Sequence, residues 1–487
     1  MLDLVNKEFS ASRDKVQLKL DRLNERKKLY MNIENQDEKV YVRMIYSVVQ
    51  TLIGLYYKDS PTVKFMGRQL GDDAYAENLS NLQKFDYDEM GLPEKRYYVQ
   101  WDKFMSGVGI EVLSGWDSVT KTPKFKVMSP ESRYPDVEFD VNNGYRYHGF
   151  ELIASKHEFA GKKGFFNTGK IKNVDQMKVQ KMIDQEIQKG YTEEQSKANI
   201  DAKDNRLLQV LEDGRNDVIS IYQHYTRIKG IPYIFTLAND KSLLIRAERI
   251  KAVFTEEGKD AGYIDFPIII RNWSPLKGDP WGVSVPDILE DKQKAAQLFL
   301  YLNKVKAENE AWGDMFLYDP NVIENIGDLQ MPGTGPRFLA ANLTQGGTPL
   351  MEVPKAQIKS DSFQMGALLV QQGESDVGVD DALRGISPGS ARTATEHQRV
   401  QKNANLRLLL GSRIDGWAEK KFWRLWYRSY YENFKRDDKK NIYLNNGLGQ
   451  ISYVVQKKDF TTKGDLDIKI ISLSELREIE ENQRVSF

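Results

Sequence analysis

The sequence predicts an α+β protein, with helices at the start of the chain, strands through its middle and helices again in its second half. Near the N-terminus and after residue 284, apolar residues recur at steps of three and four, which is typical of helices with one buried face. Between about residues 108 and 271, short segments alternate apolar and polar residues between glycines and prolines, which favours antiparallel strands. A chain of 487 residues is long enough for about three domains.

The N-terminal region predicts three helical stretches. Residues 1–35 form a charged helix. Residues 39–57 form a helix that Pro61 follows, because proline cannot continue a helix. A third stretch is expected at about 73–104. The apolar face of the second helix consists of Val42, Ile45, Val49, Leu52, Ile53 and Tyr56.

Two groups of strands are expected, at residues 108–153 and 217–271. The residues between them, 155–215, are rich in lysine and glutamate with weak periodicity, which indicates a helical insertion on the surface. The clearest strand segments are 109–113, 125–128, 145–147, 218–222 and 266–270.

The pattern changes again near residue 280. Residues 278–282, Gly-Asp-Pro-Trp-Gly, predict a turn, and Ser284 directly after them predicts the N-cap of a helix. Pro286 in the first turn and Asp287 near the positive end of the helix dipole favour this start. The helix is expected to run to about Glu310.

Glycine and proline divide the next hundred residues. Residues 311–359 contain several such breaks, so they predict a compact excursion of turns and short strands. A second helix begins at Ser360 and fades near Gly373. A glycine-containing loop at 376–389 then leads into a long helix at about 391–434.

The long helix carries Gly411 and Gly416 inside it, each costing about 1 kcal/mol relative to alanine, so a kink is expected between them. Its aromatic residues Phe422, Trp426, Tyr430 and Phe434 recur every four residues, which is typical of a core or a subunit contact rather than of base stacking. Strands are expected within 441–472, followed by a short helix.

Composition excludes several classes of site. The chain has no cysteine, which rules out disulfides, thiolate zinc sites and cysteine nucleophiles. Lysine plus arginine equals aspartate plus glutamate at 70 each, and this zero net charge argues against tight, non-specific binding of nucleic acid. Neither a signal peptide nor a run of about 18 apolar residues is visible, so no membrane association is expected.

No catalytic constellation is evident, and no metal or cofactor is expected. The acidic pairs 72–73, 380–381 and 437–438 lack a nearby fixed base and are expected to be solvated. The histidines lack the spacing of metal ligands and are expected to be ordinary surface or half-buried side chains: His148, His157, His224 and His397.

The segment 164–170, Gly-Phe-Phe-Asn-Thr-Gly-Lys, comes closest to a phosphate-binding loop. It has both glycines and Lys170 at the right spacing, but Ile171 stands where the motif has a magnesium-binding Ser or Thr. No clear buried strand precedes it. The favoured interpretation is a flexible loop, and a nucleotide-binding enzyme that uses Gly164 to Lys170 is kept as an alternative.

Several further motifs occur in a specific order along the chain. The most specific is Asp380-Asp381-Ala382-Leu383-Arg384-Gly385, followed by Thr393-Ala394-Thr395-Glu396 at the start of the long helix. The other motifs lie within residues 48–61, 127–136 and 279–293. In these motifs and their order, the sequence resembles the portal (head–tail connector) proteins of tailed bacteriophages, most of all those of short-tailed phages. The insertion at 155–215 has no counterpart there.

The resemblance implies a portal fold: a mixed α/β wing, a two-helix stem, a small clip, a tunnel loop and a long kinked helix. The wing would comprise residues 1–283, with the insertion at about 155–215, and the strands at 437–472. The other parts would be stem helix 1 at 284–310, the clip at 311–359, stem helix 2 at 360–375, the tunnel loop at 376–391, the long wing helix at 392–436 and a short crown-like helix at 473–487.

The resemblance also implies which residues face the DNA channel. The tunnel loop would offer Asp380, Asp381, Arg384, Ser387 and Arg392, a mixed set of charges that touches phosphates without gripping them. Its glycines Gly378, Gly385 and Gly389 would let the loop move. In the stem, the resemblance points to Asp287, Gln293 and Phe363.

Portal proteins form a ring of twelve subunits at one capsid vertex, through which double-stranded DNA is packaged and ejected. The implied partners are copies of the chain, DNA without sequence specificity, the large terminase subunit, the major capsid protein, the scaffolding protein and the tail adaptor. The implied location is the virion, after assembly in the host cytoplasm. No enzymatic activity is expected, since the ATP-driven motor of such phages is a separate protein. The other alternative is a different structural component of a phage head–tail junction or tail.

Overall fold

A computed structural model describes the protein in two compact units. Unit 1 comprises Met1–Lys27, Val49–Asp287 and Asp381–Phe487, and unit 2 comprises Lys28–Val48 and Ile288–Asp380. Helices make up 55% and strands 28% of the described residues, which confirms the predicted α+β class. The described residues are 2–31, 41–58, 65, 73–138, 144–159, 161–162, 164–188, 192, 217–250, 266–311, 316–318, 350–352, 360–379, 394–445 and 450–460.

The first two predicted helices are confirmed as α1, Leu2–Met31, and α2, Met44–Lys58. Residues 41–43 are not helical, so α2 begins later than the sequence suggested. The predicted third helix is two helices, α3, Asp73–Glu89, and α4, Leu92–Ser106. The break lies at Gly91, whose φ of 60° is left-handed, with Pro93 in the first turn of α4.

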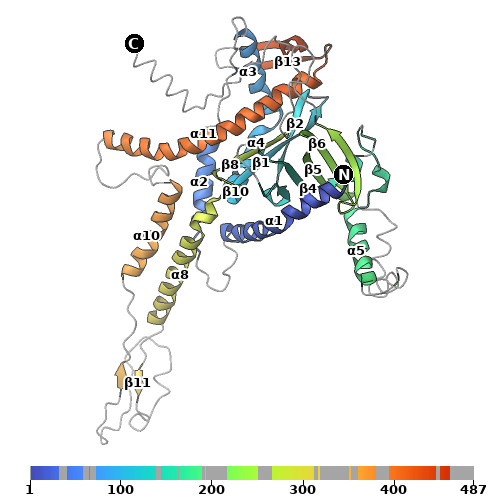
Figure 1. Cartoon of the computed structure of the whole chain (residues 1–487). Helices are drawn as coiled ribbons and strands as arrows, with labels where there is room; N and C mark the ends of the chain where they lie inside the picture. The colour runs from blue at the N-terminus through green and yellow to red at the C-terminus, as the bar shows by residue number, and fades with distance from the viewer. Residues whose placement is uncertain are drawn as a thin grey trace, which may run out of the picture. The chain divides into compact units, whose positions relative to one another are not determined.

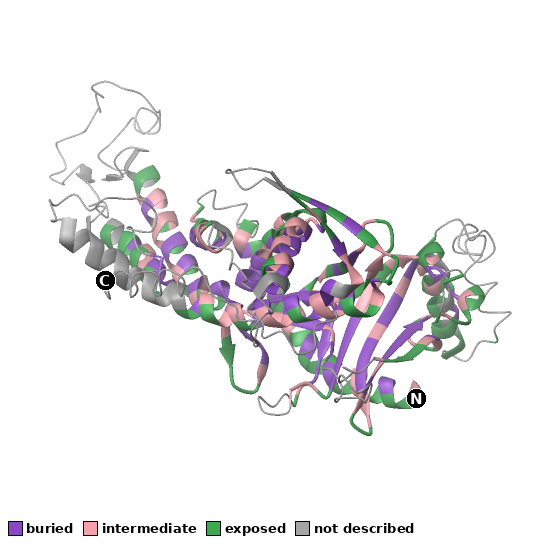
Figure 2. Cartoon of the chain, turned by 90° about the horizontal axis from the view of Figure 1, so that it is seen from above, coloured by how far each residue is buried: buried purple, intermediate pink, exposed green. Residues whose placement is uncertain are grey.

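Five antiparallel strands form the larger sheet of unit 1, in the order β3-β4-β5-β6-β7. The strands are β3, Arg133–Pro135, β4, Tyr147–Ser155, β5, Val218–Ile228, β6, Ile231–Ala238, and β7, Leu243–Arg249. Figure 2 shows many buried residues along the strands. In this sheet, Phe150, Tyr225 and Phe235 belong to the hydrophobic core. The helix α1 contacts this sheet, because Ser12 donates a hydrogen bond to the carbonyl of Pro135.

A second sheet of unit 1 has the order β2-β1-β8, with β1, Val108–Asp117, β2, Thr122–Met128, and β8, Ile268–Asn272. Both predicted strand groups are therefore confirmed. The predicted turn at 278–282 is wrong in part. Ser274–Leu276 (β9) and Asp279–Val283 (β10) form a hairpin, and the turn is confined to Lys277 and Gly278, whose φ is 80°.

The insertion at 155–215 is described only in its first half. It contains two short 3-10 helices, Lys156–Glu158 and Thr168–Lys170, and the helix α5, Val174–Gln188. Ile171 and Phe159 join a small core cluster with residues of β5, so this half is anchored on the larger sheet. Residues 189–216, apart from Thr192, lie outside the described residues.

The long helix is α11, Ala394–Asn433, and it runs without a break through Gly411 and Gly416 (Figure 1). The kink stays a prediction. The strands β13, Lys439–Asn445, and β14, Gln450–Gln456, follow it and pair with each other, before the 3-10 helix η6, Lys457–Phe460. The predicted strand at 466–470 and helix at 473–487 lie outside the described residues.

The aromatic stripe of α11 is confirmed as core. Phe422, Trp426, Tyr430 and Phe434 are all buried and belong to one cluster with residues of α3, β2 and η6. Phe422 stacks on Phe125 of β2 with ring centroids 4.1 Å apart. Apolar contacts of this kind are the main stabilising contribution of a helix that packs on a sheet.

Unit 2 contains the helices α8, Val285–Ala311, from residue 288 onward, and α10, Ser360–Val377, which lie side by side (Figure 1). Between them in the chain, β11, Phe316–Tyr318, pairs antiparallel with β12, Leu350–Glu352. This pairing agrees with the short strands expected in the excursion 311–359. The remaining residues of that excursion lie outside the described residues.

Candidate functional site

The predicted channel residues Asp380, Asp381, Arg384, Ser387 and Arg392 lie outside the described residues, so their placement stays a prediction. Phe363 lies in α10, and its side chain is outside the description as well. The structure therefore defines the elements on both sides of the predicted loop, α10 and α11, rather than the loop itself.

The end of α10 differs from the prediction. The helix passes Gly373 and ends four residues later, at Val377. The N–H of Val379 donates to the carbonyl of Glu374 at 2.9 Å, and that of Gly378 to the carbonyl of Ser375 at 3.0 Å. With Gly378 at a φ of 83°, these bonds make a Schellman cap. Gly378 thus terminates the helix, and Asp376 belongs to α10.

Gly373 has a packing role in unit 2. A Cβ atom at this position would lie 2.8 Å from the sulfur of Met44 and 3.1 Å from a methyl group of Leu289. The glycine therefore permits a close approach of α10 to α8, which a larger side chain would prevent. On the same pair of helices, Lys292 forms an ion pair with Asp376.

Gln293, singled out by the resemblance, is fully buried in unit 2 and connects three segments. Its side-chain nitrogen donates to the carbonyl of Leu29 at 3.0 Å, and its oxygen accepts from the backbone N–H of Ile45 at 2.9 Å. Residues 29 and 45 lie at the end of α1 and the start of α2. Because both halves of the amide are satisfied, Gln293 fixes the start of α2 against α8.

Asp287, the other stem residue, has a structural role at the start of α8. Its carboxylate accepts from the N–H and the hydroxyl of Ser284, both at 2.9 Å, while the Asp287 N–H donates to the Ser284 oxygen at 3.3 Å. This reciprocal arrangement is a capping box, so the predicted N-cap is confirmed. Asp287 also forms an ion pair with Arg26 of α1.

The two helices of unit 2 also expose apolar side chains. Four residues retain between 46% and 56% of their accessible surface: Leu298 and Leu302 on α8, and Met365 and Leu368 on α10. Their spacings of four and three residues place each pair on one face of its helix. Exposed apolar pairs on neighbouring helices favour a contact surface there.

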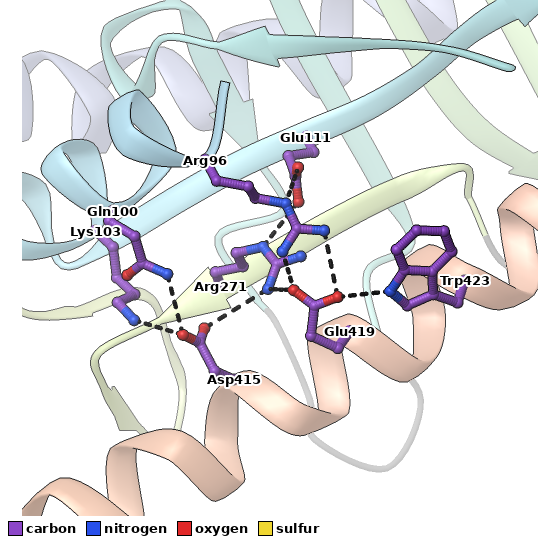
Figure 3. Close-up of polar contacts among 8 residues, drawn as sticks. All are labelled: Arg96, Gln100, Lys103, Glu111, Arg271, Asp415, Glu419 and Trp423. Carbon is purple, nitrogen blue, oxygen red and sulfur yellow. Dashed lines mark hydrogen bonds and ion pairs between the residues drawn. The ribbon is translucent and has the colours of Figure 1, made fainter. Parts of the chain in front are cut away.

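The largest polar cluster of unit 1 was not anticipated from the sequence. Figure 3 shows three cations and three carboxylates from four elements, together with Gln100 and Trp423. The charged members are Arg96 and Lys103 of α4, Glu111 of β1, Arg271 of β8, and Asp415 and Glu419 of α11, all of them buried. Their formal charges cancel, as burial of ions requires.

Glu419 has three partners in this cluster. Its carboxylate pairs with Arg96, lies 2.8 Å from the Arg271 guanidinium and accepts from the indole N–H of Trp423 at 3.0 Å. One turn earlier, Asp415 accepts from Lys103 at 2.8 Å and from Gln100 at 3.2 Å. The network therefore holds α11 against α4 and the sheet β2-β1-β8.

Burial and pairing act in opposite directions on the acids of this network. Burial raises the pKa of the Glu111 carboxyl, but Arg271 and Arg96 lower this pKa by more than burial raises it. The pKa of Glu111 therefore lies below its usual value. The pKa of Asp415 is likewise lowered, because Lys103 and Arg271 outweigh its burial. Burial, with Arg271 nearby, reduces the pKa of Arg96 to about 10. The buried pairing therefore favours the charged forms of Glu111 and Asp415.

A sequence signal for this network existed. Asp415 and Glu419 precede Phe422 and Trp426 at steps of four, three and four, so the two acids lie on the buried stripe of α11. Acids on an apolar stripe require buried cations as partners. Only the fold, however, identifies those cations, since Arg96 and Arg271 are far away in the sequence.

Of the histidines whose side chains the structure describes, His157 is at the surface as expected, whereas His148 and His224 are fully buried rather than half-buried. His148 is buried against Phe150 and accepts from Arg133 at 3.0 Å, and burial lowers its pKa well below the usual value. His224 is buried between Tyr222 and Glu8, while the side chain of His157 is exposed. Among the described residues, no group of acids and histidines has the arrangement of a metal site.

The segment 164–170 lacks the surroundings of a phosphate-binding loop. It follows a 3-10 helix instead of a strand, and α5 begins four residues after Lys170. Lys170 is exposed in the 3-10 helix Thr168–Lys170. The backbone N–H groups of a helix start, which bind phosphate in such loops, are therefore not positioned next to this lysine.

Comparison with known proteins adds no assignment, since no protein-family model and no curated protein matches the sequence. Within the described part of the chain, none of the helices combines the length and apolar character needed to cross a membrane.

Proposed function

We propose that this protein is one subunit of a phage portal, a ring through which double-stranded DNA enters and leaves a capsid. The single observation that supports it best is the exposed apolar surface on the helix pair α8 and α10. A lone subunit gains nothing from exposing Leu298, Leu302, Met365 and Leu368. In a closed ring, each subunit covers one face of its neighbour, and such surface becomes buried.

The order of the elements agrees with the stem and clip of a portal. Two helices flank a segment that contains a short hairpin, and the motif Asp380 to Gly385 follows the second helix. The described residues of both helices from residue 288 onward and of the hairpin belong to one unit, as expected of a stem with its clip. In this proposal, the loop after Gly378 contacts DNA and hinders its exit.

The decisive experiment is electron microscopy of the purified protein together with its mass in solution. The proposal expects annular particles with a central hole and, for twelve subunits of 56.1 kDa, a mass of about 670 kDa. A stable monomer under all conditions, without annular particles, contradicts it. Annular particles of a different mass would support the proposed ring but contradict the number of twelve subunits.

A pair of substitutions tests the surface that would join the subunits. Leu302→Glu with Met365→Glu places two charges on the exposed apolar faces and should abolish rings without unfolding the chain. Leu276→Glu is the matched control, because Leu276 is as exposed but lies on the hairpin β9–β10 of unit 1. If the control also loses its rings, the result no longer supports α8 and α10 as the surface that joins the subunits.

The proposed role of the loop has a separate test. Shortening residues 380–389 should impair retention of packaged DNA and leave ring assembly intact. Unchanged retention contradicts the role of the loop. The other head–tail or tail components considered above do not need a DNA-retaining loop, so this experiment also distinguishes them.

A further inference from the structure

Charge is segregated along α11. Its acids Asp415 and Glu419 point inward and are buried in the ion network. Three cations, Arg413, Lys420 and Arg424, lie on the opposite side of the helix at steps of seven and four residues. None of these three has a carboxylate partner among the described residues.

The same outward face carries large apolar side chains. Trp417, which lies between the cations in sequence, retains 71% of its accessible surface, and Leu410 and Tyr431 are exposed as well. We call the residues Leu410, Arg413, Trp417, Lys420, Arg424 and Tyr431 the outward face of α11. Arginine and tryptophan side by side are typical of protein contacts, and the apolar part argues against a phosphate backbone as the occupant.

The chain contains a segment with the complementary chemistry. Residues 473–487 carry four glutamates against two arginines, and Leu473, Leu476 and Ile479 recur every three residues. This pattern predicts an amphipathic helix with these apolar residues on one side and Glu475, Glu478 and Glu481 on the other, whereas Glu480 falls on the apolar side. Its acids match the cations of the outward face, and its apolar side matches Leu410 and Trp417.

The linker between Phe460 and the segment 473–487 is long enough for this segment to reach the outward face of α11. The last described residue, Phe460, stacks on Tyr430 at 4.8 Å and accepts a hydrogen bond from Tyr427, so the chain leaves from the C-terminal part of α11. The twelve residues from 461 to 472 span up to about 40 Å when extended. From Tyr430 to Arg413 the helix measures about 26 Å. The tether thus reaches the whole outward face.

We propose that residues 473–487 bind the outward face of α11 in the same chain, with their glutamates against Arg413, Lys420 and Arg424 and their leucines on Trp417. The tether makes this contact intramolecular, so its effective concentration is on the order of millimolar and a modest intrinsic affinity suffices. The contact does not depend on the proposed portal function.

The test measures hydroxyl-radical oxidation of Trp417 by mass spectrometry in the full chain and in a chain that ends at residue 472. Removal of the segment should raise Trp417 oxidation at least threefold. Tyr443 on β13, also strongly exposed, is the internal control and should not change. Equal oxidation of Trp417 in both chains overturns the proposal. The difference can be measured whether or not the protein forms rings.

Charge reversal shows whether the glutamates make the contact. Arg413→Glu with Arg424→Glu should expose Trp417 in the full chain, and adding Glu478→Arg with Glu481→Arg should restore its protection. Failure of the second pair to restore protection overturns the assigned charge pairing. In a mixture with isotopically labelled truncated chain, protection of the labelled Trp417 would instead assign the contact to a neighbouring copy and overturn its intramolecular form.

Discussion

The Nε of Arg271 lies 2.7 Å from a carboxylate oxygen of Glu111, and both side chains are almost completely buried. They lie on the neighbouring antiparallel strands β8 and β1, where Gly109 is paired with Arg271. This ion pair lies entirely within the sheet, so pairing of β1 with β8 brings its two residues together without any helix. When α11 docks, it adds the two carboxylates that balance Arg96 and Lys103.

Replacing Glu419 by leucine should lower the free energy of unfolding by about 3–5 kcal/mol, because Arg96 and Arg271 lose a buried partner. Urea unfolding at pH 7 measures the difference. Glu432→Ala is the control on the same helix, since Glu432 pairs with Arg428 near the surface, and it should cost about 0.5 kcal/mol or less. A loss below 1 kcal/mol for Glu419→Leu would contradict the role of the network.

Acid should weaken the fold through Glu111 and Asp415. Their pKa values in the folded protein lie below the ordinary values of 4.5 and 3.8, so the unfolded chain binds protons more readily. The stabilisation is therefore fully present above about pH 5 and is lost as the pH falls through the folded pKa values. In the Asp102→Asn variant, which removes the opposing effect of Asp102, urea midpoints at pH 7, 5, 4 and 3 should fall more steeply below pH 4 than between pH 7 and pH 5.

Asp102 should have the opposite effect on stability. Burial raises its pKa to about 8, with Glu131 adding to this and Lys27 opposing it. The folded state holds the proton while the unfolded state releases it, so stability decreases as the pH rises from about 4 to 8. Asp102→Asn, which mimics the neutral carboxyl, should be more stable than the parent at pH 8, on the order of 5 kcal/mol. The difference should vanish near pH 4; an equal difference at both values contradicts the raised pKa.

The two glycines inside α11 should respond differently to alanine. A Cβ at Gly411 would overlap the hydroxyl of Tyr56, whereas a Cβ at Gly416 meets nothing within 4 Å. Gly411→Ala should therefore destabilise the protein by about 1–3 kcal/mol, and Gly416→Ala should stabilise it by up to about 1 kcal/mol. Thermal unfolding of both variants measures this contrast, and equal effects would refute the packing role of Gly411.

The elements that the sequence predicted correctly are those determined by local pattern. The apolar stripe from Phe422 to Phe434, the cap at Ser284 and the alternating strands required no knowledge of distant residues. The errors also have local causes. Gly91 is a single left-handed residue within an otherwise continuous helical pattern, and Trp281 with its neighbours forms a strand, because the hairpin turn needs only Lys277 and Gly278.

The candidate site was less accessible to sequence reasoning. Gln293 and Asp287 were selected by resemblance, but their hydrogen bonds to Ile45 and Ser284 depend on the fold. The cap at Gly378 was not predicted, since a glycine in a loop and a glycine that caps a helix look alike until the helix end is known. The role of Gly411 became clear only with Tyr56 beside it.

The pairing of Arg96 with Glu419 joins residues 323 positions apart in the chain. During translation at about 5–20 residues per second, the second partner emerges on the order of 16–65 s after the first. For that interval the guanidinium has no access to this carboxylate, and α4 cannot complete its final packing. The native packing of α4 is thus reached only after residue 419 has been made, and a ribosome that stalls before it leaves a chain exposed to chaperones and proteases.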